Sequence, residues 1–422
     1  MANFQLTDAD RAVFSAVAAA KAPPGTIVRD FEALLSYLGA DGIRVSPKEC
    51  EFAIARLPEL NSLLTYPAPI GLSRGRQASY PHVDGLHLLL RFSRLGRIDR
   101  SRSTPRMVLD TAMLAKWQLL NPTEQYFSLL ERWWHLADGE NDLWGSAAGR
   151  FAEYRHDFLK RKRPHSGVSK QESPDPLSYL LGSRQIALMQ LFGLLDIESE
   201  AAVVGRGWKI KRMAATRWGL SASATYLKAS GYSTGALLER LLVPSVENSA
   251  ATAELSDADA GLSPFYSWAK VVLPSFPAWR NILGGVDAVE PFRGSMTFKV
   301  SLGQSVWRRI VMPAASSFED LAEFILDTFE FDDEHLYQFR YQDEYASLRM
   351  LADPRCSDVY DDCADEVTLG EAGLLPGQLV EFRYDFGDNW RFKVLLEKRD
   401  ASEGGGKPEV LAEHGKAPQQ YQ

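Results

Sequence analysis

The hydrophobic positions of this chain predict helices in its N-terminal and central parts and strands near its C-terminus. In residues 30–43, apolar side chains recur three and four positions apart before glycines interrupt them, which predicts one short helix. The same spacing predicts an apolar helix from residue 86, ended by Gly96. Residues 106–109 form a β-prone run, after which Asp110 can cap the next helix.

The clearest helix start lies in the stretch N-P-T-E. Asn121 is expected at the N-cap, Pro122 at the first helical position and Glu124 at the third, where its side chain can bond back to the cap. We therefore expect a helix to begin at Pro122.

A similar order of elements begins near residue 183. An apolar helix leads into two β-prone runs around a G-R-G turn within residues 200–213, and another helix follows. Helix, hairpin and helix in this order predict a winged-helix-like module. Residues 90–99 and 189–198 also align with their apolar positions in register, which indicates a weak internal repeat.

The C-terminal pattern is typical of a compact α+β domain. Two alternating strands come first, and an amphipathic helix follows that Ser316 or Ser317 can cap. The expected elements are strands at 296–302 and 306–312, a helix from 318, a strand at 336–341, an acidic insertion at 343–366, and a closing hairpin of 379–384 with 390–396. This β-β-α-β-β-β order favours a β-grasp-like fold.

Two polar stretches, 160–176 and 247–262, are candidate linkers, and the basic run 160–163 belongs to the first. The expected fold class is therefore α+β multidomain. The expected parts are a mainly helical N-terminal domain at 1–165, a helical, winged-helix-like domain at 177–285, the α+β domain at 291–400 and a flexible tail at 401–422.

Composition places the chain among soluble globular proteins. It has 422 residues, of which 45% are hydrophobic and 24% charged. The first residues lack a basic region leading into an apolar one, and we find no run of about 18 apolar residues. Three cysteines suit a reducing compartment better than a disulfide framework, so the cytoplasm is the expected location and no membrane partner is expected.

The net charge of −8 is unevenly distributed. Residues 291–400 contain 12 Lys/Arg and 22 Asp/Glu, a net charge of −10, which leaves +2 for the remainder. A mildly basic front and an acidic back indicate different partners, or contact with each other.

Four separated blocks of the C-terminal part resemble the plasmid pRiA4b ORF-three-like family. They are V-W-R-R-I-V-M-P-A, F-E-D-L-A-E-F-I, D-E-H-L-Y-Q-F and Y-D-F-G-D-N-W-R-F-K-V, in this order over about 110 residues. The stretches Y-P-H-V-D-G-L-H-L-L-L-R and N-P-T-E-Q-Y-F-S-L-L-E-R-W are similar to the helical extension of longer family members.

The resemblance implies a DNA-related or mobile-element setting, and the family has no settled activity. Many members continue into a segment with paired prolines and acidic residues, whereas this chain closes with H-G-K-A-P-Q-Q-Y-Q. The family motif falls on Trp307, Arg308, Arg309, His335, Leu336, Tyr384, Asp385, Phe386, Gly387, Asp388 and Trp390.

The stretch Y-D-F-G-D-N-W-R-F raises several alternatives. Asp385 and Asp388 could hold a hard divalent metal, but no D-x-D-x-D-G pattern supplies further oxygens. The structural alternative is a turn in which both carboxylates accept backbone N–H bonds and Gly387 supplies a positive φ. The letters D-F-G also occur in kinases, whose other motifs are missing here.

No complete catalytic or metal motif appears in the chain. His335, Cys356 and Cys363 match no zinc spacing, and the acidic surroundings of the two cysteines would raise a thiol pKa. We expect His335 to be a hydrogen-bonded structural residue, and we expect no cofactor, no metal and no catalytic residue.

Two clusters of basic residues are candidate nucleic-acid contacts, because guanidinium groups bind phosphates and release counterions. In the first, Arg91 and Arg94 are expected on one helix face and the rest on a loop or wing. The first cluster is Arg91, Arg94, Arg97, Arg100, Arg102 and Arg106, and the second is Arg206, Lys209, Lys211, Arg212 and Arg217. A solvated face, or docking of the arginines on the acidic C-terminal domain, is the alternative.

Three functions remain open on the sequence. The first is a non-enzymatic, DNA-associated or mobile-element-associated protein that contacts DNA through the basic clusters and a partner through its acidic C-terminal domain. The second is an interaction or scaffold protein in which the arginines pair with the acidic domain or with another subunit. The third is a metal-dependent hydrolase or nuclease at Asp385 and Asp388.

Overall fold

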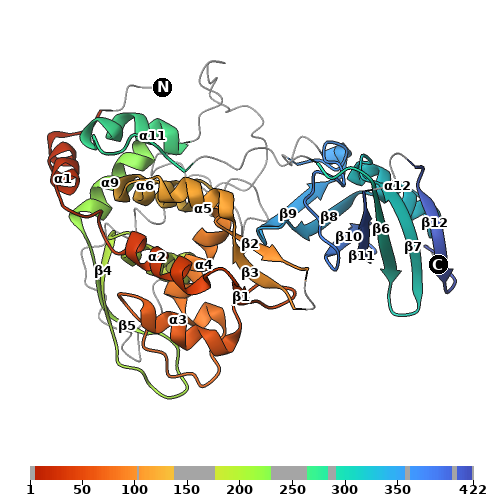
Figure 1. The fold of residues 1–422 in the computed structure, drawn as a ribbon, viewed down its shortest axis with the longest axis horizontal. Helices are drawn as coiled ribbons and strands as arrows, with labels where there is room; N and C mark the ends of the chain where they lie inside the picture. Colours follow the sequence, from red (N-terminus) through yellow and green to blue (C-terminus); the bar gives the residue numbers. More distant parts are fainter. Residues whose placement is uncertain are drawn as a thin grey trace. The chain divides into compact units, whose positions relative to one another are not determined.

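The computed structural model describes residues 5–101, 104–136, 176–229, 264–283, 291–356, 362–401 and 406–420. The chain divides into two compact units. Unit 1 comprises Met1–Ile43, Glu51–Gly96 and Leu109–Gly284, and unit 2 comprises Arg44–Cys50, Arg97–Val108 and Gly285–Gln422. Helices dominate the first unit and an antiparallel sheet the second, so the predicted α+β class is confirmed (Figure 1).

Unit 1 is a helical assembly with one small hairpin at its edge. Its described helices are α1 (Asp8–Ala18), α2 (Ile27–Leu38), α3 (Leu57–Leu63), α4 (Pro81–Phe92), α5 (Thr111–Gln118), α6 (Pro122–Glu131), α8 (Pro176–Leu191), α9 (Arg217–Ala229) and α11 (Pro264–Val272). Large aromatic side chains fill its core, among them the fully buried Trp117, Trp133 and Trp268.

The two predicted N-caps of unit 1, Asp110 and Asn121, are confirmed, whereas the helix predicted from residue 86 begins earlier, at Pro81. Asp110 caps α5, since its Oδ1 accepts a hydrogen bond from the Met113 N–H at 2.9 Å. Asn121 and Glu124 form the expected capping box of α6, with Pro122 at the first position. The local sequence alone therefore determines where these helices begin.

The aligned segments of the weak internal repeat adopt the same elements. Helix α4 is followed by strand β2 (Gly96–Asp99), and α8 is followed by strand β4 (Leu195–Ser199). The two helices also pack together, because the His82 ring bonds Gln190 at 2.8 Å and a Cβ on Gly85 would clash with Leu188.

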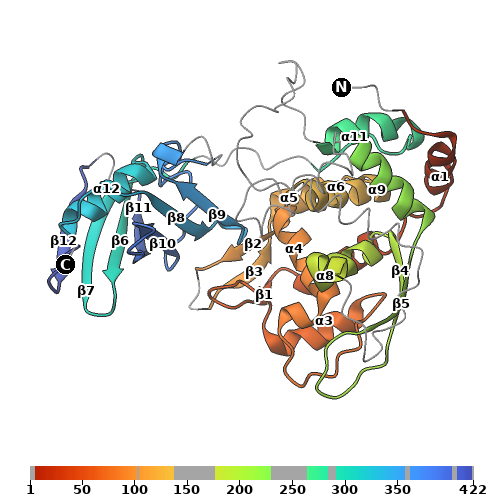
Figure 2. The same ribbon diagram turned by 180° about the vertical axis from the view of Figure 1, so that it is seen from behind.

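Strand β4 pairs with β5 (Ile210–Ala215) in an antiparallel hairpin that runs along one edge of unit 1 in both views (Figures 1 and 2). The first strand had been expected within residues 200–204, but β4 ends at Ser199 and residues 200–209 form a long loop. Apolar residues in that loop are exposed, and Val204 is 95% exposed. Their β propensity is therefore not used in a strand.

A small three-stranded sheet has the order β1-β3-β2. Its strands are β1 (Ile43–Arg44), β2 (Gly96–Asp99) and β3 (Arg106–Leu109), the last as predicted. Most of these residues belong to unit 2, where the Ile98 N–H donates to the Glu344 carbonyl at 2.7 Å.

The C-terminal domain in unit 2 is a seven-stranded antiparallel sheet covered by one helix, with the strand order β12-β7-β6-β11-β10-β8-β9 among the described residues. Its elements are β6 (Ser295–Leu302), β7 (Val306–Pro313), α12 (Phe318–Thr328), β8 (Tyr337–Gln342), β9 (Leu348–Ala352), β10 (Leu379–Tyr384), β11 (Trp390–Asp400) and β12 (Glu409–His414). A capping box of Ser317 and Asp320 starts α12, and Phe318, Leu321 and Ile325 on the helix are fully buried.

Two strands of this sheet differ from the expectation. Strand β9 forms inside the segment expected to be an acidic insertion, and β12 forms inside the segment expected to be a flexible tail. Strand β12 pairs with β7 between Glu409 and Val311. The prediction of a flexible tail is therefore wrong for residues 409–414. A strand at the edge of a sheet pairs through its backbone N–H and C=O groups, so it can form without alternating apolar residues.

No helix in the described part of the chain is long and apolar enough to cross a membrane.

Candidate functional site

The Y-D-F-G-D turn joins β10 to β11. Asp385 is buried, and its Oδ1 accepts hydrogen bonds from the Gly387 N–H at 2.9 Å and the Asp388 N–H at 3.3 Å. Asp388 is exposed. The Asp385 carboxylate thus holds the turn while Asp388 is exposed, so the structural alternative is confirmed for Asp385 but not for Asp388.

The conformation of this turn corrects one detail. The positive φ angles belong to Asp385 (52°) and Asn389 (58°), not to Gly387. Asp and Asn tolerate the left-handed region because their short polar side chains bond locally. In Asp385 the same side chain also supplies the acceptor that closes the turn.

Tyr384 and His335 lie beside the turn in a network of hydrogen bonds. The buried Tyr384 hydroxyl bonds Asp332, at 2.7 Å to its carbonyl and 2.8 Å to its Oδ1, and accepts from the His335 N–H at 3.3 Å. Burial, followed by the bond to Asp332, raises the pKa of Tyr384. The His335 Nε2 lies 3.8 Å from Asp385 Oδ2, so the imidazole lies beside the carboxylate that closes the turn.

The motif residues on β7 divide between the two faces of the strand. Arg308 is buried, lies over the Phe329 ring at 4.9 Å and donates to four carbonyl groups. Arg309 is more exposed and pairs with Glu397 at 2.6 and 3.1 Å. Trp307 stacks on His414 of β12 at 5.9 Å. These contacts are structural, since they attach β12 and the end of α12 to the sheet.

The remaining motif residues surround the turn. Phe386 and Leu336 are partly exposed, at 43% and 37%. Arg383 lies over the Phe386 ring at 4.7 Å, and Trp390 packs edge-on against Phe331 at 5.0 Å. These motif residues therefore pack together at the end of a folded hairpin.

In the described part of the chain, the cysteines and acidic side chains considered above do not come together as a thiol or metal site. Burial, then the carboxylates of Glu366 and Asp365, raises the pKa of the Cys363 thiol, as the acidic surroundings predicted. Cys50, Cys356 and Cys363 form no disulfide. In the described ranges, no three His, Cys, Asp or Glu side chains are grouped so as to hold a metal ion.

The first arginine cluster does not form one exposed face. Helix α4 ends at Phe92, and Arg94 follows with a φ of 59° as the chain reverses toward β2, so the expectation that Arg91 and Arg94 share a helix face is wrong. Arg91 is only 7% exposed. Its guanidinium is therefore not available as a phosphate contact.

The later arginines of this cluster lie in unit 2. Arg97 and Arg106 are half-buried, and Arg100 donates to the Pro47 carbonyl at 3.3 Å and to Cys50 Sγ at 3.4 Å. Arg102 lies outside the described residues. The described arginines of this segment, Arg97, Arg100 and Arg106, are therefore half-buried side chains of unit 2.

The second basic cluster is different because all of its members are exposed. Arg206 and Lys209 lie in the loop between β4 and β5, Lys211 and Arg212 lie on β5, and Arg217 begins α9. Sequence inspection missed the acidic strand opposite: Glu198 Oε1 bonds Lys211 at 2.5 Å, and Oε2 lies 3.6 Å from Arg212. Lys211 lowers the pKa of Glu198, so the carboxylate offsets part of the local positive charge.

The hairpin is fixed at both ends. At its base, the Thr216 hydroxyl donates to the Gly193 carbonyl at 2.7 Å, and the Trp218 Nε1–H donates to the buried Tyr126 hydroxyl at 2.8 Å. At its tip, Gly71 donates to the Arg206 carbonyl and accepts from Gly205 at 2.9 and 2.8 Å. The loop that carries Arg206 is therefore held by the backbone of another loop.

That second loop contributes two basic residues that sequence inspection missed. Arg74 and Arg76 follow Gly71 in I-G-L-S-R-G-R, and both are exposed. Only the long-range pairing of residue 71 with residues 205–206 brings this loop to the hairpin, and nothing in local periodicity signals it.

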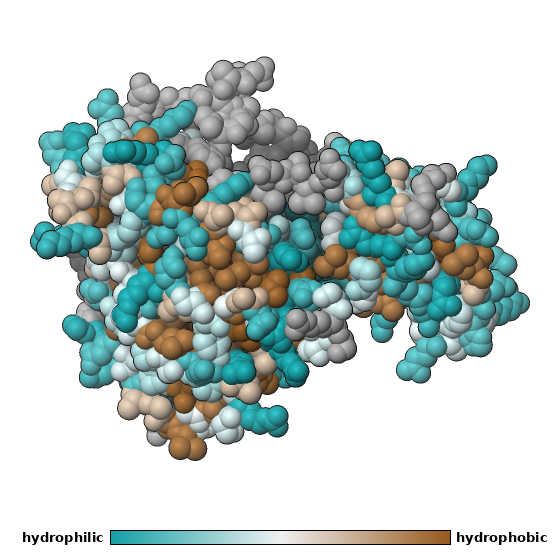
Figure 3. Space-filling model, viewed as in Figure 1, coloured by the Kyte–Doolittle hydropathy of each residue, from teal (hydrophilic) through white to brown (hydrophobic). Residues whose placement is uncertain are grey.

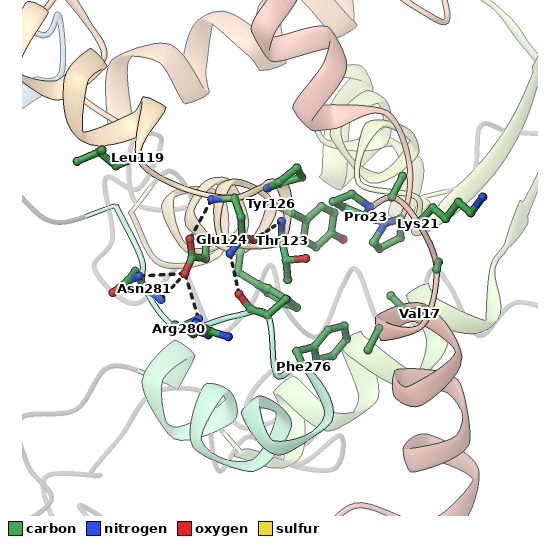
Figure 4. Close-up of a pocket in the computed structure, with 18 residues that line it drawn as sticks. Val17, Lys21, Pro23, Leu119, Thr123, Glu124, Tyr126, Phe276, Arg280 and Asn281 are labelled. Atoms are coloured by element: carbon green, nitrogen blue, oxygen red, sulfur yellow. Dashed lines mark hydrogen bonds between the residues drawn. The ribbon is translucent and has the colours of Figure 1, made fainter.

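Unit 1 also contains a pocket beside the start of α6, with a volume of about 550 Å³. Its lining residues are drawn in Figure 4. Its most buried charge is Glu124, whose carboxylate accepts from the backbone of Asn121 and from Arg280 and Asn281 at 2.9–3.2 Å. Since these structural bonds occupy both carboxylate oxygens, Glu124 is not an available general base.

Comparison with known proteins places the C-terminal region. Residues 295–420 match the family model described as plasmid pRiA4b ORF-3-like protein, so the resemblance of this region is confirmed. A solved structure, the crystal structure of protein of unknown function MM3350 from Methanosarcina mazei Go1, is 27% identical, with coverage of 31% of this chain and 74% of that chain and a TM-score of 0.27. No curated protein matches the chain.

Proposed function

We propose that this protein is a non-enzymatic, DNA-associated cytoplasmic protein that contacts phosphate through the β4–β5 hairpin, while its acidic C-terminal domain binds a partner. One observation carries the proposal: four of the five exposed basic residues of the second cluster lie on a hairpin that is fixed at its base and its tip, and the fifth, Arg217, begins the helix that follows. A rigid array loses less conformational entropy when it binds a duplex than flexible side chains on a mobile loop do.

The element order supports this use of the hairpin. Helix α8, hairpin β4–β5 and helix α9 follow one another as in a winged-helix module, in which a β hairpin lies beside two helices. On this interpretation the exposed tip with Arg206 corresponds to the wing. The C-terminal domain retains the β-grasp-like assignment as part of the same proposal.

The local charge is favourable but small. Residues 195–217 contain five Lys/Arg and three Asp/Glu, and Arg74 and Arg76 add two positive charges, for a local balance of +4. A few phosphate contacts give weak, sequence-independent binding that falls steeply with salt. We therefore expect micromolar rather than nanomolar affinity, and a strong dependence on ionic strength.

The test measures binding of a fluorescent duplex by anisotropy at low salt. Arg206→Ala/Lys209→Ala removes two charges from the hairpin loop, and Arg11→Ala/Lys270→Ala removes two exposed charges from α1 and α11. We expect the hairpin variant to bind at least about fivefold more weakly and the control to bind like the wild type. Both variants change the net charge equally, so a difference between them reports where the duplex contacts the protein. Equal losses in both variants would show a non-specific charge effect and refute the hairpin as the contact surface.

A second function, an interaction protein whose arginine segment docks on its acidic domain, is favoured by a different observation. Residues 97–108 belong to unit 2, where Ile98 bonds Glu344 and the Cys50 thiol lies 3.5 Å from the Gln342 Oε1. This function predicts that the Ile98 amide is protected from hydrogen exchange in the free protein and that DNA does not change its protection. Fast exchange at Ile98 would contradict it.

A further inference from the structure

A second pocket, of about 220 Å³, opens in unit 2 beside one face of helix α12. Residues of α12 line one side of this pocket, and residues just before and at the start of β8 and just after β9 complete its lining. The polar lining residues are Glu319, Glu323, Asp333, Tyr337, Asp353 and Arg355, and the apolar ones are Ala322 and Leu326.

The pocket carries an excess of negative charge. Arg355 is committed to Asp353, with its Nη2 and Nε atoms 2.6 and 2.9 Å from the two carboxylate oxygens. No ion pair among the described residues involves Glu319, Glu323 or Asp333. Three carboxylates are thus left without a described cation, and burial followed by neighbouring carboxylates raises the pKa of Glu319.

A tyrosine with a buried hydroxyl group belongs to the same lining. Tyr337 is only 7% exposed, lines the pocket, and its hydroxyl has no hydrogen-bond partner in the described part of the chain. A buried polar group left without a partner destabilises the folded state, because its lost hydrogen bonds to water are not replaced. Burial, then the charge of Asp353, raises the pKa of Tyr337, so the hydroxyl stays protonated and can both accept and donate.

The chemistry of the lining distinguishes between classes of cation. A metal ion needs several oxygens converging within about 2.0–2.6 Å of one point. No such group of acidic side chains occurs in the described residues. A polyatomic cation instead spreads its N–H donors over several carboxylates, and its alkyl stem can lie on Ala322 and Leu326.

We infer that this pocket binds an alkylguanidinium or alkylammonium group, with the Tyr337 hydroxyl accepting one N–H and the α12 carboxylates accepting others. Such a group belongs either to a small free cation or to an Arg or Lys side chain of a protein partner. The inference deepens the partner-binding part of the proposed function. The pocket lies in unit 2 and the basic hairpin in unit 1, so a failure of DNA binding and a failure of cation binding are distinguishable.

The experiment titrates the full-length protein with butylguanidine, a monocation, by calorimetry at low salt. Three further probes are butylurea, its neutral analogue, choline, a cation without N–H donors, and magnesium chloride. We expect butylguanidine to bind, and butylurea, choline and magnesium to bind much more weakly or not at all. A blocked Gly-Arg-Gly peptide carries the same group and the same single charge on a backbone: tighter binding than butylguanidine indicates a protein partner, and weaker binding indicates a small free cation.

Two variants and one control assign the binding to this pocket. Tyr337→Phe removes only the hydroxyl, Glu323→Gln removes an exposed charge from the lining, and Asp327→Asn removes an exposed charge from α12 outside the lining. We expect at least about a fivefold loss of butylguanidine affinity in the first two and no change in the control. Glu323 is exposed, so its substitution keeps the test valid if Tyr337→Phe misfolds. Equal affinity in all three variants, equal binding of choline, or no binding of butylguanidine and the peptide at about 10 mM would overturn the inference.

Discussion

Arg308 should hold the C-terminal domain together far more strongly than its neighbour Arg309. The Arg308 side chain is 8% exposed, and its guanidinium donates to the carbonyls of Thr328 at 3.1 Å, Trp307 at 3.0 Å, His414 at 3.3 Å and Gly415 at 3.2 Å. It thereby satisfies a carbonyl at the end of α12 and two at the end of β12. We propose Arg308→Met as the perturbation, because methionine keeps the apolar stem and removes every donor.

The magnitude follows from the partners that lose their donor. A hydrogen bond to a charged group contributes about 1.5–3 kcal/mol, but water can return to carbonyls near the exposed edge of β12. We therefore expect a loss of about 3 kcal/mol, less than the sum of four bonds. In a domain of about 130 residues, 1 kcal/mol corresponds to roughly 3–5 °C, so the Tm of this domain should fall by roughly 10 °C.

The matched control is Arg309→Met. Arg309 points to the opposite face of β7, where its side chain is 36% exposed and pairs with Glu397. A pair of this kind contributes at most about 1 kcal/mol, so the control should lose less than about 4 °C.

The assay is calorimetry combined with hydrogen exchange of the β12 amides. We expect Arg308→Met to raise exchange across residues 409–414 while the amides of β10 and β11 keep most of their protection. If Arg308→Met and Arg309→Met lower Tm equally, or if β12 exchanges at the wild-type rate in Arg308→Met, the assignment of Arg308 as the residue that holds β12 and α12 is refuted.

Three further predictions concern stability. The His82 Nε2 bonds Gln190, its Nδ1 has no partner among the described residues, and burial lowers its pKa below the ordinary value of 6.5. The contribution of His82 to folding stability is therefore present above pH 6.5 and lost as pH falls below it. Chemical unfolding at pH 7 and pH 5 should show a smaller loss of stability in His82→Phe than in the wild type. A Cβ at Gly219 would lie 2.3 Å from the Leu194 carbonyl oxygen, so Gly219→Ala should destabilise the protein by about 1–3 kcal/mol, whereas Gly207→Ala, whose nearest contact is 4.0 Å, should be neutral in the same denaturation experiment. Asp385→Ala should cost about 1–2 kcal/mol by removing the acceptor that closes the turn, and Asp388→Ala should cost less than about 0.5 kcal/mol; the reverse order in urea denaturation would restore Asp388 as the important carboxylate.

Elements with a local signal could be predicted from the sequence. The helix start at Asn121 and the hairpin of 379–384 with 390–396 were both correctly placed, because capping residues and period-two alternation are properties of a few neighbouring residues. The N-cap of α12 at Ser317 has the same origin. Each depends on bonds formed within about four residues, or across one tight turn.

Features that depend on distant segments could not be predicted. Strand β12 has no alternating burial, and only its pairing with β7 makes it a strand. The positions of Arg74 and Arg76 beside the hairpin depend on Gly71 meeting residues 205–206, and the burial of Arg91 depends on how α4 packs. Charge counting included the buried Arg91 and left out the exposed Arg74 and Arg76, because it carries no information on which side chains the fold covers or brings together.

The central claim is tested most directly by the salt dependence of DNA binding. The affinity of the full-length protein for a duplex should fall linearly with salt on logarithmic axes, with a slope set by the number of phosphates contacted. Arg206→Ala/Lys209→Ala should reduce that slope by about 2, roughly one for each lost contact, while Arg11→Ala/Lys270→Ala leaves it unchanged. An unchanged slope in the hairpin variant, or no binding of the wild type at micromolar concentration in low salt, would contradict the proposed contact surface.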